Sequence, residues 1–149
     1  MTKVFKSFLI AVVFISAAGI YSCSKLCDEG YEGKRCDVEM RVKFIGAWNA
    51  TDNPGGFTFT DTISNATGIL DVLILRRFGA DTFNRSVKAT VNGTTITIAR
   101  QKPESSRTLE IQGIGTINSD GNTINWNYDL IDTTVSPIIS TSYTGVWTK

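Results

Sequence analysis

Residues 41–149 alternate between apolar and polar positions with a period of two, which is typical of half-buried β-strands. The clearest alternation is at 123–131, where Ile124, Trp126, Tyr128 and Leu130 share one parity and polar residues fill the other. Eight such runs can be counted, at 41–51, 57–64, 69–76, 86–91, 94–99, 108–117, 123–131 and 139–149. No ten-residue stretch here sustains a helical period of 3.6, so the region is predicted to be all-β.

Short turn signals separate these runs and indicate how the strands connect. Asn92-Gly93 is the strongest hairpin signal, while 52–56 and 119–122 are Gly-containing turns and 79–84 is interpreted as a longer connection. Eight strands with short links favour an eight-stranded antiparallel up-and-down barrel, which leaves no exposed sheet edge. A two-sheet sandwich is the alternative, although it would usually need longer crossing connections.

Two Gly-x-Trp motifs lie at the ends of this region. Gly46-Ala47-Trp48 resembles the G-x-W motif on the first strand of lipocalin-like (calycin) barrels, and Gly145-Val146-Trp147 repeats it on the last run. The resemblance implies that Trp48 plugs the closed end and that the first and eighth strands are neighbours, with Trp48 and Trp147 near their seam. Two family features are not found in the sequence: the T-D-Y motif, and an arginine on the last strand to stack on the tryptophan. Residues 41–149 also resemble small lipoprotein barrels of Bacteroidetes.

Residues 1–22 have the features of an export signal. Lys3 and Lys6 precede an apolar run of 13 residues at 8–20, which is too short to span a bilayer and has the length of a signal core. Ile-Tyr-Ser-Cys at 20–23 resembles a bacterial lipobox, which implies that Cys23 is lipidated and anchors the chain without a transmembrane helix. The implied location is the bacterial cell envelope, as an outer-membrane lipoprotein on either the surface or the periplasmic face. A soluble secreted protein cleaved nearby is the competing interpretation, and a short buried helix is a further one.

A short cysteine motif follows the expected lipidation site. Residues 27–36, C-D-E-G-Y-E-G-K-R-C, resemble the C-terminal loop of EGF-like domains, in which the two terminal cysteines close a small hairpin. The resemblance implies a disulfide between Cys27 and Cys36, and lipidation of Cys23 would leave those two as the remaining pair. We therefore expect three segments: a signal peptide at 1–22, a lipid anchor and disulfide-stapled EGF-like stub at 23–40, and the barrel at 41–149. The stub would serve as a collar between membrane and barrel, or as a docking motif.

Composition and charge exclude several kinds of chemistry. The 149 residues contain no histidine, which removes Ser–His and Cys–His nucleophile pairs and histidine metal sites. The net charge of +1 falls to −1 without the two signal lysines, so no nucleic-acid partner is expected. Asp129 and Asp132 are placed on the outer face as solvated acids. No cofactor, metal site or catalytic residue is predicted, and the protein is not expected to be an enzyme. A hydrolase is the third hypothesis.

The inward parity of the barrel is rich in aromatic residues, and these are the tentative ligand-binding positions. They are Phe44, Trp48, Phe57, Phe59, Trp126, Tyr128, Tyr143 and Trp147. Such side chains either enclose a small ligand or fill the interior, and their number favours a packed core. The leading hypothesis is a membrane-anchored exported lipoprotein that acts as a non-enzymatic binding module for a small apolar ligand or an envelope or surface partner. The alternative is a structural component of an envelope complex with a fully packed barrel.

Overall fold

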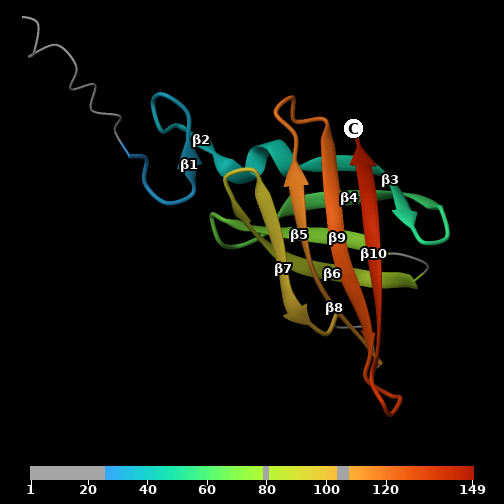
Figure 1. The fold of residues 1–149 in the computed structure, drawn as a ribbon. Helices are drawn as coiled ribbons and strands as arrows, with labels where there is room; N and C mark the ends of the chain where they lie inside the picture. The colour runs from blue at the N-terminus through green and yellow to red at the C-terminus, as the bar shows by residue number, and fades with distance from the viewer. Residues whose placement is uncertain (1–25, 79–80, 104–107) are drawn as a thin grey trace, which may run out of the picture.

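Eight antiparallel strands close into a single barrel in the computed structural model, which describes residues 26–78, 81–103 and 108–149 (Figure 1). The predicted signal and Cys23 lie outside the described residues. The barrel strands are β3 (Gly46–Asn53), β4 (Phe57–Asn65), β5 (Asp71–Phe78), β6 (Asp81–Asn92), β7 (Thr95–Gln101), β8 (Leu109–Ile117), β9 (Thr123–Asp132) and β10 (Ile139–Thr148). Each strand pairs with its neighbour in the chain, and β10 pairs with β3 to close the ring. The up-and-down barrel is thus confirmed in preference to the sandwich.

Several predicted boundaries were wrong, and two of them are the starts of strands. The run at 41–51 begins as a 3₁₀ helix, η1 (Met40–Phe44), and the strand starts only at Gly46, whose φ of +129° favours glycine and lets the chain change direction. The segment at 79–84 was interpreted as a connection, yet β6 begins at Asp81. Backbone pairing carries the β5–β6 hairpin past its last alternating apolar residue, through a bulge after Leu75, to the pair Phe78↔Asp81.

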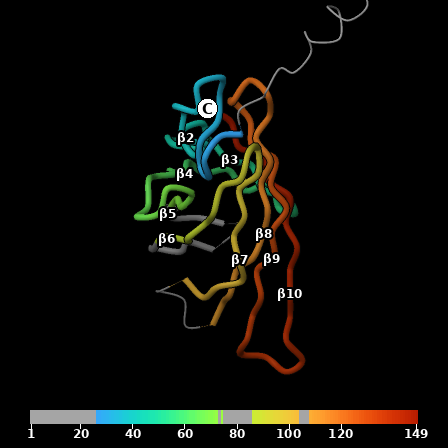
Figure 2. Tube along the Cα trace, turned by 90° about the vertical axis from the view of Figure 1, so that its left-hand side faces the viewer, coloured from blue at the N-terminus to red at the C-terminus, as the bar shows by residue number. Residues whose placement is uncertain are grey.

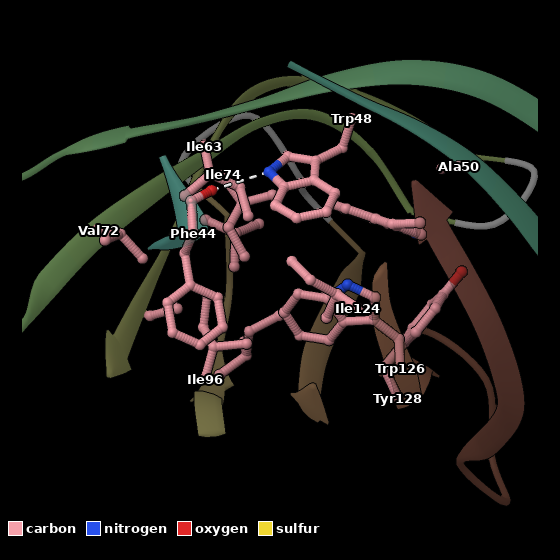
Figure 3. Packing of buried hydrophobic residues seen from close by; sticks show 14 of the residues in the cluster. Phe44, Trp48, Ala50, Ile63, Val72, Ile74, Ile96, Ile124, Trp126 and Tyr128 are labelled. Carbon is pink, nitrogen blue, oxygen red and sulfur yellow. Dashed lines mark hydrogen bonds between the residues drawn. The ribbon is translucent and has the colours of Figure 1, made fainter. Parts of the chain in front are cut away.

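The inward residues of β9 fit against glycines on β8. Trp126 and Tyr128, which are 1% and 3% exposed, lie opposite Gly115 and Gly113. A Cβ atom at Gly113 would stand 2.4 Å from the Cβ of Tyr128, and one at Gly115 would stand 2.9 Å from the Trp126 ring. These two positions therefore admit no larger residue while the rings stay in place. The alternation predicted for this strand is confirmed, and Figure 3 shows the two rings inside the barrel.

The cysteine stub packs on one end of the barrel. Cys27 and Cys36 form a disulfide, beside the two-stranded ladder of β1 (Tyr31–Glu32) and β2 (Val38–Glu39). Arg41 Nη1 donates hydrogen bonds to the carbonyl oxygens of Ala66 at 3.0 Å and Gly68 at 2.6 Å, in the connection between β4 and β5. These contacts join η1, which follows the stub, to the barrel end. Figure 1 shows the stub beside this end.

The β9–β10 hairpin projects from the opposite end of the barrel, as both views show (Figures 1 and 2). β10 pairs with β9 over all of Ile139–Thr148, but it pairs with β3 only from Thr144 onward. β3 ends at Asn53, and its chain turns away through Pro54 toward β4. The first half of β10 therefore lies outside the closed ring.

Candidate functional site

A buried carboxyl group lies at the centre of a hydrogen-bond network inside the barrel. Asp52 continues the inward parity of Trp48 and Ala50 on β3 and is 0% exposed. The Tyr128 hydroxyl donates to Asp52 Oδ2 at 2.5 Å, and Trp147 Nε1 donates to Asp52 Oδ1 at 3.2 Å. Buried polar groups are stable only when hydrogen-bonded, so this network fixes three strands, β3, β9 and β10, relative to one another.

The residue opposite Asp52 on β10 is Gly145, and its lack of a side chain makes room for the carboxyl group. A Cβ atom at Gly145 would stand 2.3 Å from Asp52 Oδ1, far inside van der Waals contact. The Gly-x-Trp motif at 145–147 thus has a local physical explanation. Its glycine accommodates the Asp52 carboxyl group, and its tryptophan hydrogen-bonds to it.

Aromatic rings fill the space around this network. Trp147 packs against Trp126 with ring centroids 5.2 Å apart and against the edge of Phe59 at 6.0 Å. Tyr128 and Tyr143 stack at 5.3 Å with nearly parallel planes. Rings at these distances are in direct contact. The interior is therefore occupied by side chains at this level (Figure 3).

Most of the predicted interior aromatics are buried or pack on the core, and Phe57 is the exception. Phe44, Trp48, Trp126, Tyr128 and Trp147 are at most 3% exposed, and Phe59 and Tyr143 pack against them. Phe57 is 36% exposed, so its placement in the interior was wrong. It shares the inward parity but begins β4, at the rim, and its ring lies over Gly55 of the preceding turn. Parity alone does not bury a residue where the strand has passed the end of the barrel.

Trp48 is held at the end of the barrel that carries the stub. Its Nε1 donates to the carbonyl oxygen of Phe44 at 2.8 Å, drawn as the dashed line in Figure 3. Lys149 Nζ lies 4.7 Å from the centre of a Trp48 ring and donates to the Lys43 carbonyl oxygen at 2.9 Å. The resemblance to calycin barrels implied an arginine stacked on this tryptophan. In this chain a lysine, the last residue printed, provides the cation.

A groove with a volume of about 860 Å³ crosses β7, β8, β9 and β10 beside the end of β3. Its wall includes the outward-facing residues Gln112, Ile114, Asn127, Asp129, Ser142 and Thr144. Because Trp126 and Tyr128 point inward, Asn127 and Asp129 project from the outer face of β9. Inward-facing Ile98, Tyr128 and Tyr143 line the groove as well, so it combines outward polar side chains with the edge of the core.

A hydrogen-bonded row of side chains lies in this groove. Ser142 Oγ donates to Asp129 Oδ1 at 2.6 Å, and Gln112 Nε2 donates to Asp129 Oδ2 at 3.0 Å. The hydroxyl of Ser142, and to a lesser degree the Gln112 amide, hold the pKa of Asp129 below its usual value. Ile114, which is 46% exposed, adds an apolar position beside the row. The groove thus presents a fixed acidic group and an apolar contact to solvent.

Two carboxyl groups lie inside the barrel, and their separation bears on the hydrolase hypothesis. Asp52 and Asp61 are both buried, and the strand register puts Asp52 opposite Phe57 and Asp61 opposite Trp48. Four residues along a strand separate the two positions by roughly 13 Å. Paired carboxylates in glycosidases lie about 5–9.5 Å apart, so these two do not form such a pair.

Asp52, Asp61 and Lys149 were not among the predicted site residues. For Asp52 the available signal was its inward parity, which continues from Trp48 and Ala50. Within the described ranges, no three His, Cys, Asp or Glu side chains gather as a metal site would require, and no helix is long and apolar enough to cross a membrane.

Comparisons with known proteins add no assignment to this geometry. No protein-family model, curated protein or solved structure matches the chain.

Proposed function

We propose that this chain is an exported lipoprotein, tethered through Cys23 to the outer membrane of a bacterial envelope, whose packed barrel is a scaffold for binding an envelope or surface partner in the groove across β7–β10. The observation that carries the proposal is the contrast between the two faces of the sheet. On the inner face, Trp147, Trp126 and Phe59 are in ring contact around a buried carboxyl group. On the outer face, the groove offers Asp129, Ile114 and Asn127 to solvent.

The same contrast favours a surface partner over a small apolar ligand in the interior. A ligand among the rings would have to displace groups that hydrogen-bond to Asp52, and each such loss is costly in a buried site. A partner in the groove would contact Tyr128 and Tyr143, which line it, without having to enter the space between the rings. It would meet the Asp129 carboxylate, the Arg100 guanidinium and the exposed Ile114, a mixture that suits a protein surface of polar and weakly apolar character.

The tether is tested by labelling the full chain in its host with an alkyne analogue of palmitate. Label is expected on the native chain and is expected to be lost in Cys23→Ala. Retention of the label in that variant would contradict the tether.

The groove is tested with a photo-crosslinking residue in place of Ile114, in intact host cells, followed by mass spectrometric identification of the product. A single envelope component should be captured, and capture should be lost in Asn127→Arg, which fills the groove. Asn125→Arg is the matched control, because Asn125 is the preceding exposed outward residue of β9 and does not line the groove. Equal capture from both arginine variants would refute the groove as the binding surface.

Native mass spectrometry of the protein purified from its host tests the small-ligand alternative. A bare chain mass supports the scaffold. A bound mass that organic solvent removes would overturn it and make the protein a carrier.

A further inference from the structure

The first half of β10 is a strand with one open edge. Ile139–Tyr143 pairs with β9, but pairing with β3 starts only at Thr144↔Asn53. Among the described residues, no other strand pairs with this segment. Five residues of strand span about 16 Å, and along that length the backbone N–H and C=O groups of one edge face away from the sheet.

This edge lacks the features that normally block pairing with another chain. Its sequence, Ile-Ser-Thr-Ser-Tyr, contains no charge, no proline and no glycine. Ile139 is 56% exposed, and Ile138 just before it is 59% exposed. Exposed strand edges in native proteins are usually protected by lysine, proline or a bulge, and an unprotected edge is a template for a further strand.

We propose that this edge pairs with the same edge of a second copy of the chain, antiparallel and centred on Thr141. A two-fold symmetric contact requires the segment to be complementary to itself, and this one is. The register sets Ile139 against Tyr143 of the second copy, and Ser140 against Ser142. Both Ile–Tyr pairs are favourable cross-strand contacts, and no like charges meet.

The surrounding structure leaves room for this arrangement. β3 stops at Asn53, opposite Thr144, so positions 139–143 are free as a block. The hairpin projects beyond the barrel, away from the stub (Figures 1 and 2). Two hairpins can therefore meet edge to edge while their barrels lie on opposite sides of the symmetry axis. A ladder of five residues is smaller than a standard protein interface, so the dimer is expected to be weak and is best detected by trapping.

The first test is cysteine trapping in the full chain, exported and purified in mild detergent. In the proposed register the two Thr141 side chains lie directly opposite each other, with Cβ atoms about 4.5–5.5 Å apart. Mild oxidation of Thr141→Cys should yield a disulfide-linked dimer. Thr116→Cys is the control, because Thr116 is an exposed strand threonine whose two neighbours, β7 and β9, occupy both edges. Equal yields from both variants would overturn the proposal, as would a mixed disulfide of Thr141→Cys with another protein in place of a dimer.

The second test introduces a charge at the symmetry axis and measures self-association by sedimentation. Thr141→Lys sets two ammonium groups against each other and should weaken self-association by about fivefold or more, and Thr141→Glu should act alike. A mixture of the two variants should restore association to at least the native level. Failure of the mixture to associate, with both variants folded by circular dichroism, would refute the pairing. Thr141 does not line the groove, but Ser142 and Tyr143 of the same edge do, so crosslinking through Ile114 is repeated in the Thr141 variants: lost self-association with unchanged crosslinking separates this pairing from partner binding in the groove.

Discussion

Replacing Tyr128 by phenylalanine removes one hydroxyl group from the interior and keeps the ring. That hydroxyl is the donor 2.5 Å from Asp52 Oδ2, and both residues are at most 3% exposed. Water cannot easily replace the lost donor at such a site. Loss of a partner for a buried polar group costs about 1–3 kcal/mol. For a domain of this size each kcal/mol lowers the melting temperature by roughly 4 °C.

Tyr143→Phe is the matched control for this prediction. Tyr143 stacks on Tyr128, so the same atom is removed from an adjacent ring of the same kind. Among the described residues the Tyr143 hydroxyl does not take part in the Asp52 network, and the ring is only partly buried. We expect its effect to stay within about 0.5 kcal/mol. Urea unfolding followed by tryptophan fluorescence measures both variants. Equal destabilisation by the two, or none by Tyr128→Phe, would show that the Asp52 network does not stabilise the barrel.

Three further predictions concern the interior, the groove and the stub end of the barrel. Gly145→Ala should destabilise the protein by about 1–3 kcal/mol, because the added methyl group overlaps the Asp52 carboxyl group. The same substitution should cost clearly less in an Asp52→Ala background. A double-mutant cycle of denaturation midpoints that shows no coupling between the two sites would contradict this. The pKa of Asp129 should rise toward 3.8 in Ser142→Ala, which a carboxyl NMR titration measures. Because the pKa of Asp129 is lower in the folded state than in the unfolded state, ionised Asp129 stabilises the fold above about pH 4. This stabilisation is lost as the pH falls through the folded-state pKa. Lys149→Met should cost about 0.5–1 kcal/mol in the free energy of unfolding while Lys149→Arg should cost less, and equal melting temperatures of all three proteins would exclude a cationic contact with the tryptophan.

The sequence predicted the barrel well where alternation was uninterrupted. On β9, four inward apolar residues alternate with polar ones, and all four are buried. Closure of the ring by the first and last strands also followed from the strand count and the repeated Gly-x-Trp motif. In these places local pattern and tertiary packing impose the same requirement, so one implies the other.

Asp52 shows why the interior network was missed. It belongs to an Asp-Asn-Pro-Gly-Gly sequence, whose residue types are those of a turn, and was therefore assigned to the connection. The strand extends through Asn53, so a carboxyl group with the chemistry of a turn residue lies inside the barrel. Its partners are 76 and 95 residues away in sequence, and a local sequence pattern cannot predict contacts over such separations.

The groove could not be predicted for a different reason. Its polar residues Gln112, Asn127, Asp129, Ser142 and Thr144 lie on the outward parity of β8, β9 and β10, where polar side chains are expected whether or not they bind anything. What brings Gln112, Asp129 and Ser142 into one row is the register of β8, β9 and β10. Register depends on turn lengths and on the packing of the opposite face, and it becomes visible only when the strands are placed.

The contact of Asp52 with Tyr128 and Trp147 also has a consequence for how the chain folds. The hairpins from β3 to β9 can form from neighbouring segments, but this contact joins the first barrel strand to the last two across 76 and 95 residues of chain. Contacts of such high sequence separation form late, because their loop-closure entropy is lost before they stabilise anything. Substitutions at Asp52 are therefore expected to accelerate unfolding and to leave the refolding rate nearly unchanged. The barrel closes only when β10 pairs with β3, and the Asp52 network then slows its reopening. The lifetime of the folded barrel therefore depends on this network.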